Sequence, residues 1–334
     1  MMKAFTIDRY GSNDNVHAVQ VPDPQLRDDD VLVEIHAASI NPLDAKIRDG
    51  KVKTILPYRL PLILGNDLAG LVDRVGAAVR RFQPGDQVYA RPDQDRIGTF
   101  AELISIKQDD VALKPTGLTI EQAASLPLVA LTAWQALVER ANLKPGQKVL
   151  IHAGSGGLGS IAIQLAKHLG ASVATTTSTA NVDWVTALGA DIVIDYRTSD
   201  FETVLHDYDV VFDPLGGDTL NKSFGVLKRG GKLISVSGPP DPEFAKSADL
   251  NPILRQAIRV LSYPTRRTAK RHGVTYSFLW MEANGDQLAK IASLVDSGII
   301  RPVIDRVFPF ESTKEALAYL DQGRAKGKVV ITMR

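Results

Sequence analysis

The sequence predicts an α/β protein of two domains: a doubly wound parallel sheet with helices on both faces, and a twisted β-domain whose chain is discontinuous. Three observations lead to this expectation. The 334 residues exceed the usual limit for one hydrophobic core. The middle of the chain alternates β-favouring runs with helix-length segments, and the first third carries short β-favouring runs separated by Pro, Gly and Asp. We expect the β-domain to comprise residues 1–120 and 280–334, and the parallel-sheet domain residues 121–279.

The composition excludes several functional classes. Apolar residues make up 44% and charged residues 23%, which is ordinary for a globular protein, and the net charge of +1 does not indicate a nucleic-acid or membrane partner. The chain has no cysteine, which rules out disulfides, thiolate nucleophiles and cysteine-containing zinc sites. The start, MMKAFTIDRYGS, lacks the apolar segment of a signal peptide, and no apolar run reaches the length of a membrane span. We therefore expect a cytoplasmic protein.

The first third is expected to form strands joined by turns and by long loops such as residues 42–62. At Thr119 the pattern changes to helix, because Thr119 and Gln122 have the spacing of a capping box. The following run, VALTAWQALVERANL, continues helically until KPGQ ends it. The predicted strands of this region are KAFTI, VLVEIHAAS, LAGLVDRVG, DQVYA and AELISI.

From Lys148 onward, strand-like and helix-like segments alternate, which is typical of a parallel sheet. The predicted strands are KVLIHA, SVATTT, DIVID, DVVFDP and KLISVS, and GVTYSFL at 273–279 is a candidate sixth. The tail then predicts helix, strand, helix, strand in DQLAKIASLVDS, PVIDRVFPF, TKEALAYLDQ and KVVITM. We expect this tail to pack back onto the first domain.

The strongest local signal is HAGSGGLGSIAIQLAKHLGA, residues 152–171. Its glycines follow a predicted strand and open an amphipathic helix, which is the arrangement that brings a helix N-terminus to a dinucleotide pyrophosphate. The fingerprint consists of Ala153, Gly156 and Gly159. A plain tight turn between strand and helix is the alternative. The predicted cofactor contacts are Ala153, Gly154, Ser155, Gly156, Gly157, Leu158 and Gly159.

The choice of dinucleotide depends on the end of the second strand, ATTTSTAN, residues 174–181. An NAD site normally has an acidic residue there for the ribose 2′-hydroxyl, and this stretch has none. The hydroxyls of Thr177, Ser178 and Thr179 can donate to a 2′-phosphate, and Tyr196 and Arg197 after the third strand can join them. We therefore favour NADPH. The alternative is that these Ser and Thr residues only finish a strand.

Two turns, DPLGG at 213–217 and VSGPP at 236–240, end the fourth and fifth strands. Ligands bind beyond the carboxyl ends of strands in such sheets. We therefore expect Pro214, Ser237 and Gly238 to contact the cofactor, although turn chemistry alone also explains both stretches.

Together these segments resemble the medium-chain dehydrogenase/reductase superfamily, in particular its zinc-free quinone oxidoreductase (zeta-crystallin-like) branch. The resemblance implies a Rossmann domain, a GroES-like β-domain and a homodimer formed through the cofactor domain. The matching stretches are ASINPLD, LPLILGNDLAG, FQPGDQVYA, LTAW, the glycine loop, DIVIDYR, DPLGG and GKVVI, in the family's order.

The same resemblance bears on the metal. Zinc-dependent relatives carry a cysteine ligand where Asn41 stands and His-Glu where Asn66-Asp67 stand, and Leu128 or a neighbour occupies the place of the third ligand. Amides and an aliphatic side chain are poor zinc ligands. We therefore expect no metal site, and we expect Asp67 to pair with a base. The histidines show no ligand spacing: His17, His36, His152, His168, His206 and His272.

The expected reaction is NADPH-dependent reduction of a quinone or an α,β-unsaturated carbonyl, because these acceptors take a hydride without a metal to activate them. The resemblance places Asn41 at the nicotinamide ribose and the substrate, and Thr132 near the nicotinamide. Tyr58 is a candidate proton donor, although packing under its loop is the favoured alternative. Phe278 is a candidate wall of the nicotinamide pocket, and core packing explains it equally well. A lysine of the branch that meets the 2′-phosphate is replaced by Thr179. Candidate phosphate contacts at the end of the chain are Arg324, Lys326 and Lys328.

A basic run at residues 255–272 supports two alternative functions. No acid occurs from 250 to 281. The run is either a solvated face or the rim of a site for an acyl-CoA, which would make the protein an enoyl-thioester reductase. A non-catalytic NADPH-binding module, with RNA contact through the basic run, is the third possibility. The basic residues are Arg255, Arg259, Arg266, Arg267, Lys270 and Arg271.

Overall fold

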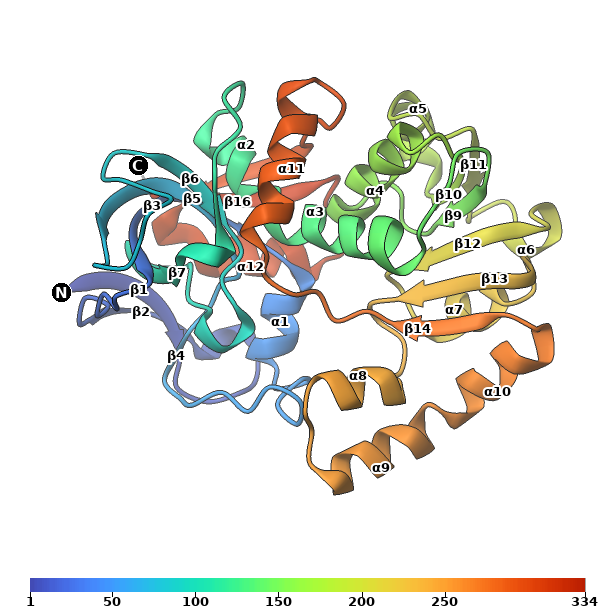
Figure 1. Ribbon diagram of the computed structural model, residues 1–334, viewed down its shortest axis with the longest axis horizontal. Coiled ribbons are helices and arrows are strands. Elements are labelled where there is room, and N and C mark those ends of the chain that lie inside the picture. Colours follow the sequence, from blue (N-terminus) through green and yellow to red (C-terminus); the bar gives the residue numbers. More distant parts are fainter. Residues whose placement is uncertain (334) are drawn as a thin grey trace. The chain divides into compact units, whose positions relative to one another are not determined.

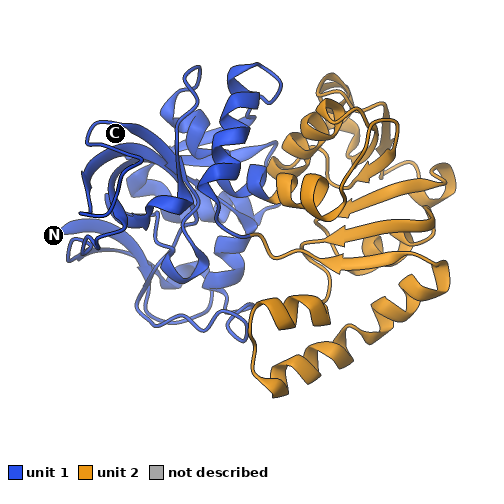
Figure 2. Cartoon of the chain, viewed as in Figure 1, with its two compact units in different colours: residues 1–131, 282–334 blue, residues 132–281 orange. Residues whose placement is uncertain are grey.

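The computed structural model describes residues 1–333 and divides the chain into two compact units (Figures 1 and 2). Unit 1 comprises Met1–Leu131 and the chain from Glu282 onward, and unit 2 comprises Thr132–Met281. The chain therefore passes into unit 2 inside a helix, after Leu131 rather than after residue 120. Among residues 1–333, none of the helices has both the length and the apolar character needed to cross a membrane.

Unit 1 is built on a mixed sheet in the order β15-β16-β3-β5-β6-β8, with β7 pairing β3. The C-terminal strand β16 pairs antiparallel with β3, with Ile331 opposite Ala38, so the predicted return of the tail is confirmed. A second, three-stranded sheet has the order β2-β1-β4. The strands are β1 Met2–Ile7, β2 Val16–Val21, β3 Asp30–Ile40, β4 Leu62–Ile63, β5 Asp67–Val75, β6 Gln87–Ala90, β7 Leu103–Lys107, β8 Val111–Leu113, β15 Ile304–Pro309 and β16 Lys328–Thr332.

The core of unit 1 joins residues from both ends of the chain. Val33 and Ile35 of β3 are buried together with Leu317 of α12 and Ile331 of β16. Burial of such side chains is the main stabilising contribution to this unit. The helices of unit 1 are α1 Pro42–Arg48, α2 Ile120–Ala124, α11 Gly285–Asp296 and α12 Thr313–Asp321, and α3 Pro127–Trp134 spans the boundary.

Helix α1 lies in a segment that the sequence predicted as loop. The helix begins because Pro42 occupies its first position and the Asp44 carboxylate accepts a hydrogen bond from the Asn41 N–H at 2.7 Å. The sequence did not predict this start, because a proline followed by a polar stretch is also typical of a loop. By contrast, the predicted capping box of α2 is confirmed: Thr119 N donates to Gln122 Oε1 at 3.0 Å, and Gln122 N donates to Thr119 Oγ1 at 3.3 Å.

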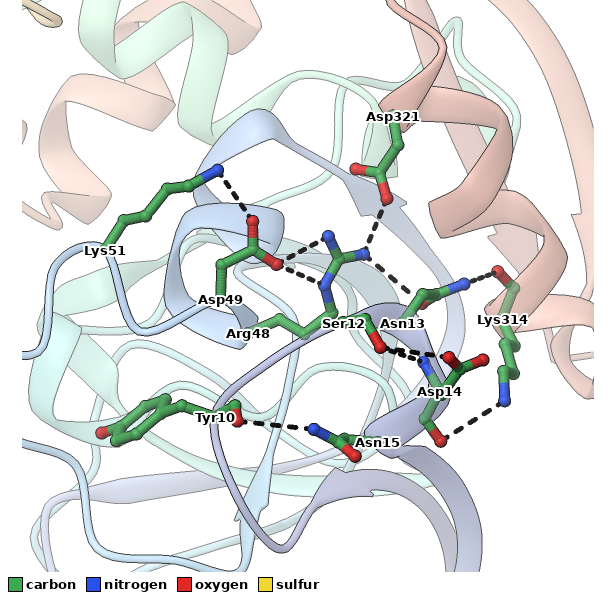
Figure 3. A network of polar contacts seen from close by, with 10 residues as sticks. All are labelled: Tyr10, Ser12, Asn13, Asp14, Asn15, Arg48, Asp49, Lys51, Lys314 and Asp321. Carbon is green, nitrogen blue, oxygen red and sulfur yellow. Dashed lines mark hydrogen bonds and ion pairs between the residues drawn. The ribbon is translucent and has the colours of Figure 1, made fainter.

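A buried arginine fixes the end of α1. Arg48 is 5% exposed and donates to Asp49 at 2.9 Å and to Asp321 of α12 at 2.8 Å (Figure 3). The pair with Asp321 links α1 to a helix that lies far away in the sequence. Because both carboxylates lie within hydrogen-bond distance, they hold the pKa of Arg48 above its ordinary value in spite of burial.

Unit 2 is a six-stranded parallel sheet in the order β11-β10-β9-β12-β13-β14, as the sequence predicts. The order reverses at β9, whose carboxyl end carries the glycine loop, and such a switch point is where ligands bind. The strands are β9 Lys148–Ile151, β10 Ser172–Thr177, β11 Ile192–Asp195, β12 Tyr208–Asp213, β13 Leu227–Ser235 and β14 Thr275–Phe278. The helices are α4 Gly157–His168, α5 Val182–Ala187, α6 Phe201–Val204, α7 Gly217–Ser223, α8 Pro242–Ser247, α9 Pro252–Leu261 and α10 Tyr263–His272.

Candidate active site

The glycine loop joins β9 to α4 as the sequence predicts, and its glycines have separate roles. Ala153 adopts a positive φ of 55°, which starts the turn. A Cβ on Gly159 would lie 2.3 Å from the Ala153 carbonyl oxygen, and one on Gly154 would lie 2.3 Å from Thr175 Oγ1. Gly159 is therefore required where α4 packs against the loop, and Gly154 where the loop packs against β10.

The N-terminus of α4 is open to an anion. The helix starts at Gly157, and its N-cap residue Gly156 has no side chain to bond the first N–H groups. Its first turn contains no acidic residue. The free N–H groups and the positive end of the helix dipole together favour a phosphate. This local geometry fits the pyrophosphate of a dinucleotide held by residues 153–159.

The three hydroxyls after β10 differ in availability. Thr177 is 1% exposed, and its Oγ1 has no partner among the described residues. Ser178 Oγ accepts from Asn181 at 3.1 Å, and Thr179 Oγ1 donates to Asp195 Oδ2 at 2.6 Å. This last bond lowers the pKa of Asp195, so a carboxylate stands where the sequence suggested only hydroxyls. Arg197, which is exposed, is the neighbouring positive charge.

The turns after β12 and β13 are organised by Asp213. Its buried carboxylate accepts from Gly216 N at 3.0 Å and from Ser235 Oγ at 2.8 Å. Ser235 Oγ in turn accepts from Gly238 N at 2.8 Å, so DPLGG and VSGPP lie side by side. Pro214, Ser237 and Gly238 are half-buried at this end of the sheet.

Phe278 is 5% exposed and lies in an aromatic cluster. Its ring centroid is 5.2 Å from that of Phe244 and 6.2 Å from that of Trp280. This packing accounts for its position, and its contact with nicotinamide stays a prediction. Thr132, at the start of unit 2, is buried on α3.

The opening residues of α1 and β5 form a buried polar cluster in unit 1, which we call the Asp67 network. Asp67 is fully buried and accepts four hydrogen bonds. The donors are Ser39 Oγ at 2.7 Å, Asn41 Nδ2 at 2.8 Å, Leu128 N at 2.7 Å and Lys328 Nζ at 3.2 Å. The prediction that Asp67 pairs with a base is therefore confirmed, and the base is Lys328.

Lys328 also fixes the orientation of Asn41. Its Nζ donates to Asn41 Oδ1 at 2.5 Å, and the amide of Asn41 faces Asp67 with its nitrogen. Lys328 is 5% exposed and Asn41 is 1% exposed. Arg324 and Lys326, in contrast, are exposed. The three basic residues predicted to act together thus differ: two are surface charges, and the third is the counter-ion of Asp67.

A second carboxylate adjoins the network. Asp44 accepts from the Asn41 N–H at 2.7 Å and from Asn66 Nδ2 at 2.7 Å. Burial raises the pKa of Asp44 to about 6 in spite of these bonds. Asn66 Oδ1 is buried and has no hydrogen-bond partner among the described residues.

Zinc does not fit this donor set. The oxygens of Asn41 and Asp67 already hold the ammonium of Lys328, and Leu128 contributes only its N–H. A divalent cation would have to displace a buried positive charge and bind amides, which are weak zinc ligands. Within residues 1–333, no group of three or more His, Cys, Asp or Glu side chains is arranged to hold a metal.

Tyr58, the candidate proton donor, is half-buried and uses its hydroxyl within the protein. The hydroxyl donates to the Gln94 carbonyl oxygen at 2.8 Å, and burial raises the pKa of Tyr58 above its ordinary value. To protonate a substrate, the side chain would have to leave this carbonyl. Its role stays a prediction.

Comparison with known proteins places these features in context. Residues 27–116 match the model of the alcohol dehydrogenase GroES-like domain, and residues 188–331 match that of the zinc-binding dehydrogenase family. The second description names a metal that the Asp67 network does not accommodate.

Similar proteins are found along the full length of the chain. The chloroplastic NADPH-dependent alkenal/one oxidoreductase of Arabidopsis thaliana is 36% identical, over 99% of this chain and 79% of the relative. The 2-methylene-furan-3-one reductase of Solanum lycopersicum is 38% identical, over 99% and 79%. The solved structure of the quinone oxidoreductase from Coxiella burnetii has a TM-score of 0.87 at 34% identity and covers 100% of this chain and 99% of that one.

The Lys328–Asp67 pair should be essential for stability. We expect Lys328→Met to lower the free energy of unfolding by about 3–5 kcal/mol, because it leaves a buried carboxylate without its counter-ion. The double variant Asp67→Asn, Lys328→Met should lose less than the sum of the two single variants. Urea unfolding measures all three, with exposed Lys326→Met as the control. Additive single effects would contradict the pairing.

Asp44 should make stability depend on pH. The folded state binds its proton more tightly than the unfolded state, where the pKa is 3.8 rather than about 6. Its contribution is therefore complete below about pH 4 and is lost as the pH rises through about 6. Between these values, unfolding experiments should show a smaller loss of stability for Asp44→Asn than for the wild type. The exposed variant Asp73→Asn should follow the wild type; parallel curves for all three would refute the assignment.

Proposed function

This chain belongs to the medium-chain dehydrogenase/reductase superfamily and, within it, to the zinc-independent quinone oxidoreductase branch, and from that premise we propose its reaction. It is an NADPH-dependent oxidoreductase that reduces quinones or α,β-unsaturated carbonyl compounds. The observation that supports this best is an open dinucleotide loop in a chain whose metal position is taken by the Asp67–Lys328 pair.

Bound NADPH supplies a hydride to an electron-poor carbon. In unit 2 the free N–H groups of α4 would hold the pyrophosphate, and the unpartnered Thr177 hydroxyl would be available to the ribose phosphate. Arg197 balances the charge of Asp195 near that phosphate. The proposed cofactor contacts are Asn41, Thr132, Ala153, Gly154, Ser155, Gly156, Gly157, Leu158, Gly159, Thr177, Ser178, Thr179, Tyr196, Arg197, Pro214, Ser237, Gly238, Phe278, Arg324, Lys326 and Lys328.

Conjugated carbonyls suit a site without zinc. Oxidation of an alcohol requires a stabilised alkoxide, which zinc provides in metal-dependent relatives and which the amides of Asn41 and Asn66 do not. Hydride addition to an enone or a quinone needs only alignment, exclusion of water and one proton. We assign the alignment to Asn41, whose amide is held at both ends, and the proton to Tyr58 or water.

The enoyl-thioester alternative is supported by the charge of α10. Arg267, Lys270 and Arg271 are exposed on this helix, which would suit the phosphates of an acyl-CoA. Not all of the basic run is available, since Arg255 pairs with Asp249 and Arg266 donates to the Arg259 carbonyl oxygen. We rank this function second.

A homodimer is the proposed assembly. On α9, the side chains of Ile253, Val260 and Leu261 are 82%, 62% and 70% exposed. A stripe of this kind is typical of a surface that a partner covers. Strand β14, which follows α9 and α10 in the chain, is the outermost strand of its sheet and has a free edge within the described residues.

We also propose a cytoplasmic location. The absence of cysteine suits a reducing compartment. Relatives carry names that place them in chloroplasts or mitochondria, so expression of a tagged full chain in its own host and fractionation decide this point.

The reaction is tested with EDTA-treated protein and four acceptors: a benzoquinone, a short 2-alkenal, a saturated ketone and an enoyl-CoA. We expect NADPH oxidation with the first two, and at least about tenfold lower kcat/KM with NADH. The saturated ketone is the control and should not be reduced. Activity that disappears with EDTA and returns with zinc would contradict the proposal, and turnover of the enoyl-CoA alone would establish the second-ranked function.

The assembly is tested by light scattering after gel filtration. The wild type should elute at twice its 36.2 kDa, and Val260→Glu with Leu261→Glu should shift it to the monomer, because two buried charges oppose association. Val204→Glu alters an apolar residue of α6 that is 52% exposed and should not change the mass. A variant of α9 that remains dimeric would show that this face is not the interface.

A further inference from the structure

Arg91, the residue that follows β6, is a buried cation that forms no ion pair within the described part of the chain. It is 2% exposed, and its Nε has no hydrogen-bond partner within residues 1–333. Across the same residues, no carboxylate forms an ion pair with its guanidinium. Arginine is almost never buried in this way unless it is paired, since removing its charge from water is costly. Neither the sequence pattern nor the reaction described so far uses this residue.

The sheet register brings Arg91 to the Asp67 network. Leu68 of β5 pairs with Ala90 of β6, so the same register continued by one residue sets Arg91 opposite Asp67. Desolvation lowers the pKa of Arg91, and Tyr58 and Asp67 are the first two groups that act in the opposite direction. Arginine nevertheless keeps its proton at neutral pH. A fixed positive charge therefore stands beside the residues assigned to the acceptor.

The nearby carboxylates are engaged elsewhere. Asp67 is satisfied by its four donors, among them Lys328, and Asp110 accepts from the Asp93 N–H at 3.0 Å. Asp93 itself caps a short helix through Asp95 N. Asp67, Asp93 and Asp110 thus act on Arg91 only from a distance, without an ion pair among the described residues. Its Nε is left without an acceptor, which a group from outside the protein can supply.

Two other buried polar atoms lie on the adjoining segments without partners. They are Asn66 Oδ1, immediately before β5, and Thr99 Oγ1. Their segments are in contact, because Gly98 N and Thr99 N both donate to the Gly65 carbonyl oxygen, and a Cβ on Gly65 would come within 2.4 Å of Thr99 Oγ1. Unsatisfied buried groups are rare, and their concentration here indicates a site that a ligand completes.

We propose that Arg91 binds the carbonyl oxygen of the acceptor and stabilises the negative charge that develops on it; this inference rests on the proposed reductase function. Hydride adds to the β-carbon of the enone, the C=C pair moves to the adjacent C–C bond, and the C=O pair moves to oxygen. The resulting enolate oxygen faces the guanidinium. Water then protonates the α-carbon and the C=O bond reforms, leaving a saturated carbonyl compound. With a quinone, hydride adds to the conjugated ring carbon, and the same oxygen becomes the enolate and takes a proton from water. Loss of a proton from that ring carbon, with protonation of the second carbonyl oxygen, then gives the hydroquinone.

A cation held in place before the reaction is effective in this role. Because burial excludes water, its field acts on the oxyanion at full strength, and no reorganisation is needed as charge develops. The saturated ketone is a poorer substrate in the same site, since its hydride acceptor carbon lies at the carbonyl itself instead of two bonds away. Arg91 thereby also selects conjugated acceptors.

The test combines kinetics with stability in the full-length protein. Arg91→Met keeps an unbranched apolar stem and removes the guanidinium with its charge. We expect kcat to fall by about 10²–10³-fold with a change in KM of no more than about threefold, and Arg91→Lys to lie between the two. We also expect Arg91→Met to raise Tm by about 2–4 °C, because it removes an uncompensated buried charge.

Arg96→Met is the matched control. Arg96 lies on the same segment, but it donates to Asp30 Oδ1 at 2.8 Å and to Asp30 Oδ2 at 2.5 Å. Because Arg96 has a structural role, the Arg96→Met protein should have a lower Tm and a nearly unchanged kcat. The same outcome for Arg91→Met would overturn the proposal. A rise in KM with constant kcat would also overturn it, because that result describes a ground-state contact.

A spectroscopic measurement separates this inference from the reaction itself. 4-Nitrophenol changes its absorbance on ionisation, and its oxygen mimics the enolate. Wild type and Arg96→Met should lower the pKa of the bound phenol by at least about one unit relative to Arg91→Met. An equal pKa in all three proteins refutes the role of Arg91. If the wild type reduces none of the acceptors, the proposed function fails, and the phenol titration still decides whether Arg91 stabilises an oxyanion.

Discussion

The buried pair of Asp67 and Lys328 is the interaction on which unit 1 depends. Asp67 lies at the start of β5, and its donors come from the end of β3, the start of α1, α3 and the C-terminal strand β16. A fully buried carboxylate is tolerated only when its lone pairs are bonded and its charge is balanced. The burial of Asp67 in the first segment is therefore stable only with the C-terminal strand docked on β3. The two segments of unit 1 must therefore come together, because each contributes one charge of the buried Asp67–Lys328 pair.

The same pair explains why the site does not suit a metal ion. In this position a divalent ion would need deprotonated or neutral donors, and the ammonium of Lys328 provides the positive charge with its hydrogen bonds already directed at Asn41 and Asp67. A lysine cannot polarise a substrate oxygen through an open coordination position as zinc does. What it does provide is rigidity, because Asn41 is held through its oxygen and its nitrogen. The chemistry that remains is alignment and charge stabilisation.

The features that depend on neighbouring residues in the chain could be predicted from the sequence. The glycine loop, the parallel strands and the Thr119 capping box each rest on a few adjacent residues, and so does the unsuitability of Asn41 and Asn66 as zinc ligands. Contacts between distant segments were not predictable in the same way. Lys328 is 261 positions from Asp67, and its place in GRAKGKVVI suggested a contact with the cofactor phosphates. Helix α1 was concealed because Asn41, Pro42 and Asp44 form a cap that composition alone presents as a loop. Nor does YARPD show that Arg91 is buried without a counter-ion, since burial is decided by the strands around it.

Two of the buried cations of unit 1, Lys328 and Arg91, meet the cost of desolvation in opposite ways. Lys328 forms an ion pair with Asp67 and contributes to folding, whereas Arg91 forms no ion pair among the described residues and its Nε has no hydrogen-bond partner. The Nε of Arg91 therefore keeps a hydrogen that no group of the described residues accepts, and an acceptor oxygen can take it. Desolvation of Arg91 lowers the stability of the fold, whereas its fixed charge stabilises the transition state of the proposed reaction. This division of roles accounts for a site that is stable as a scaffold and yet unsatisfied at the point where chemistry is expected.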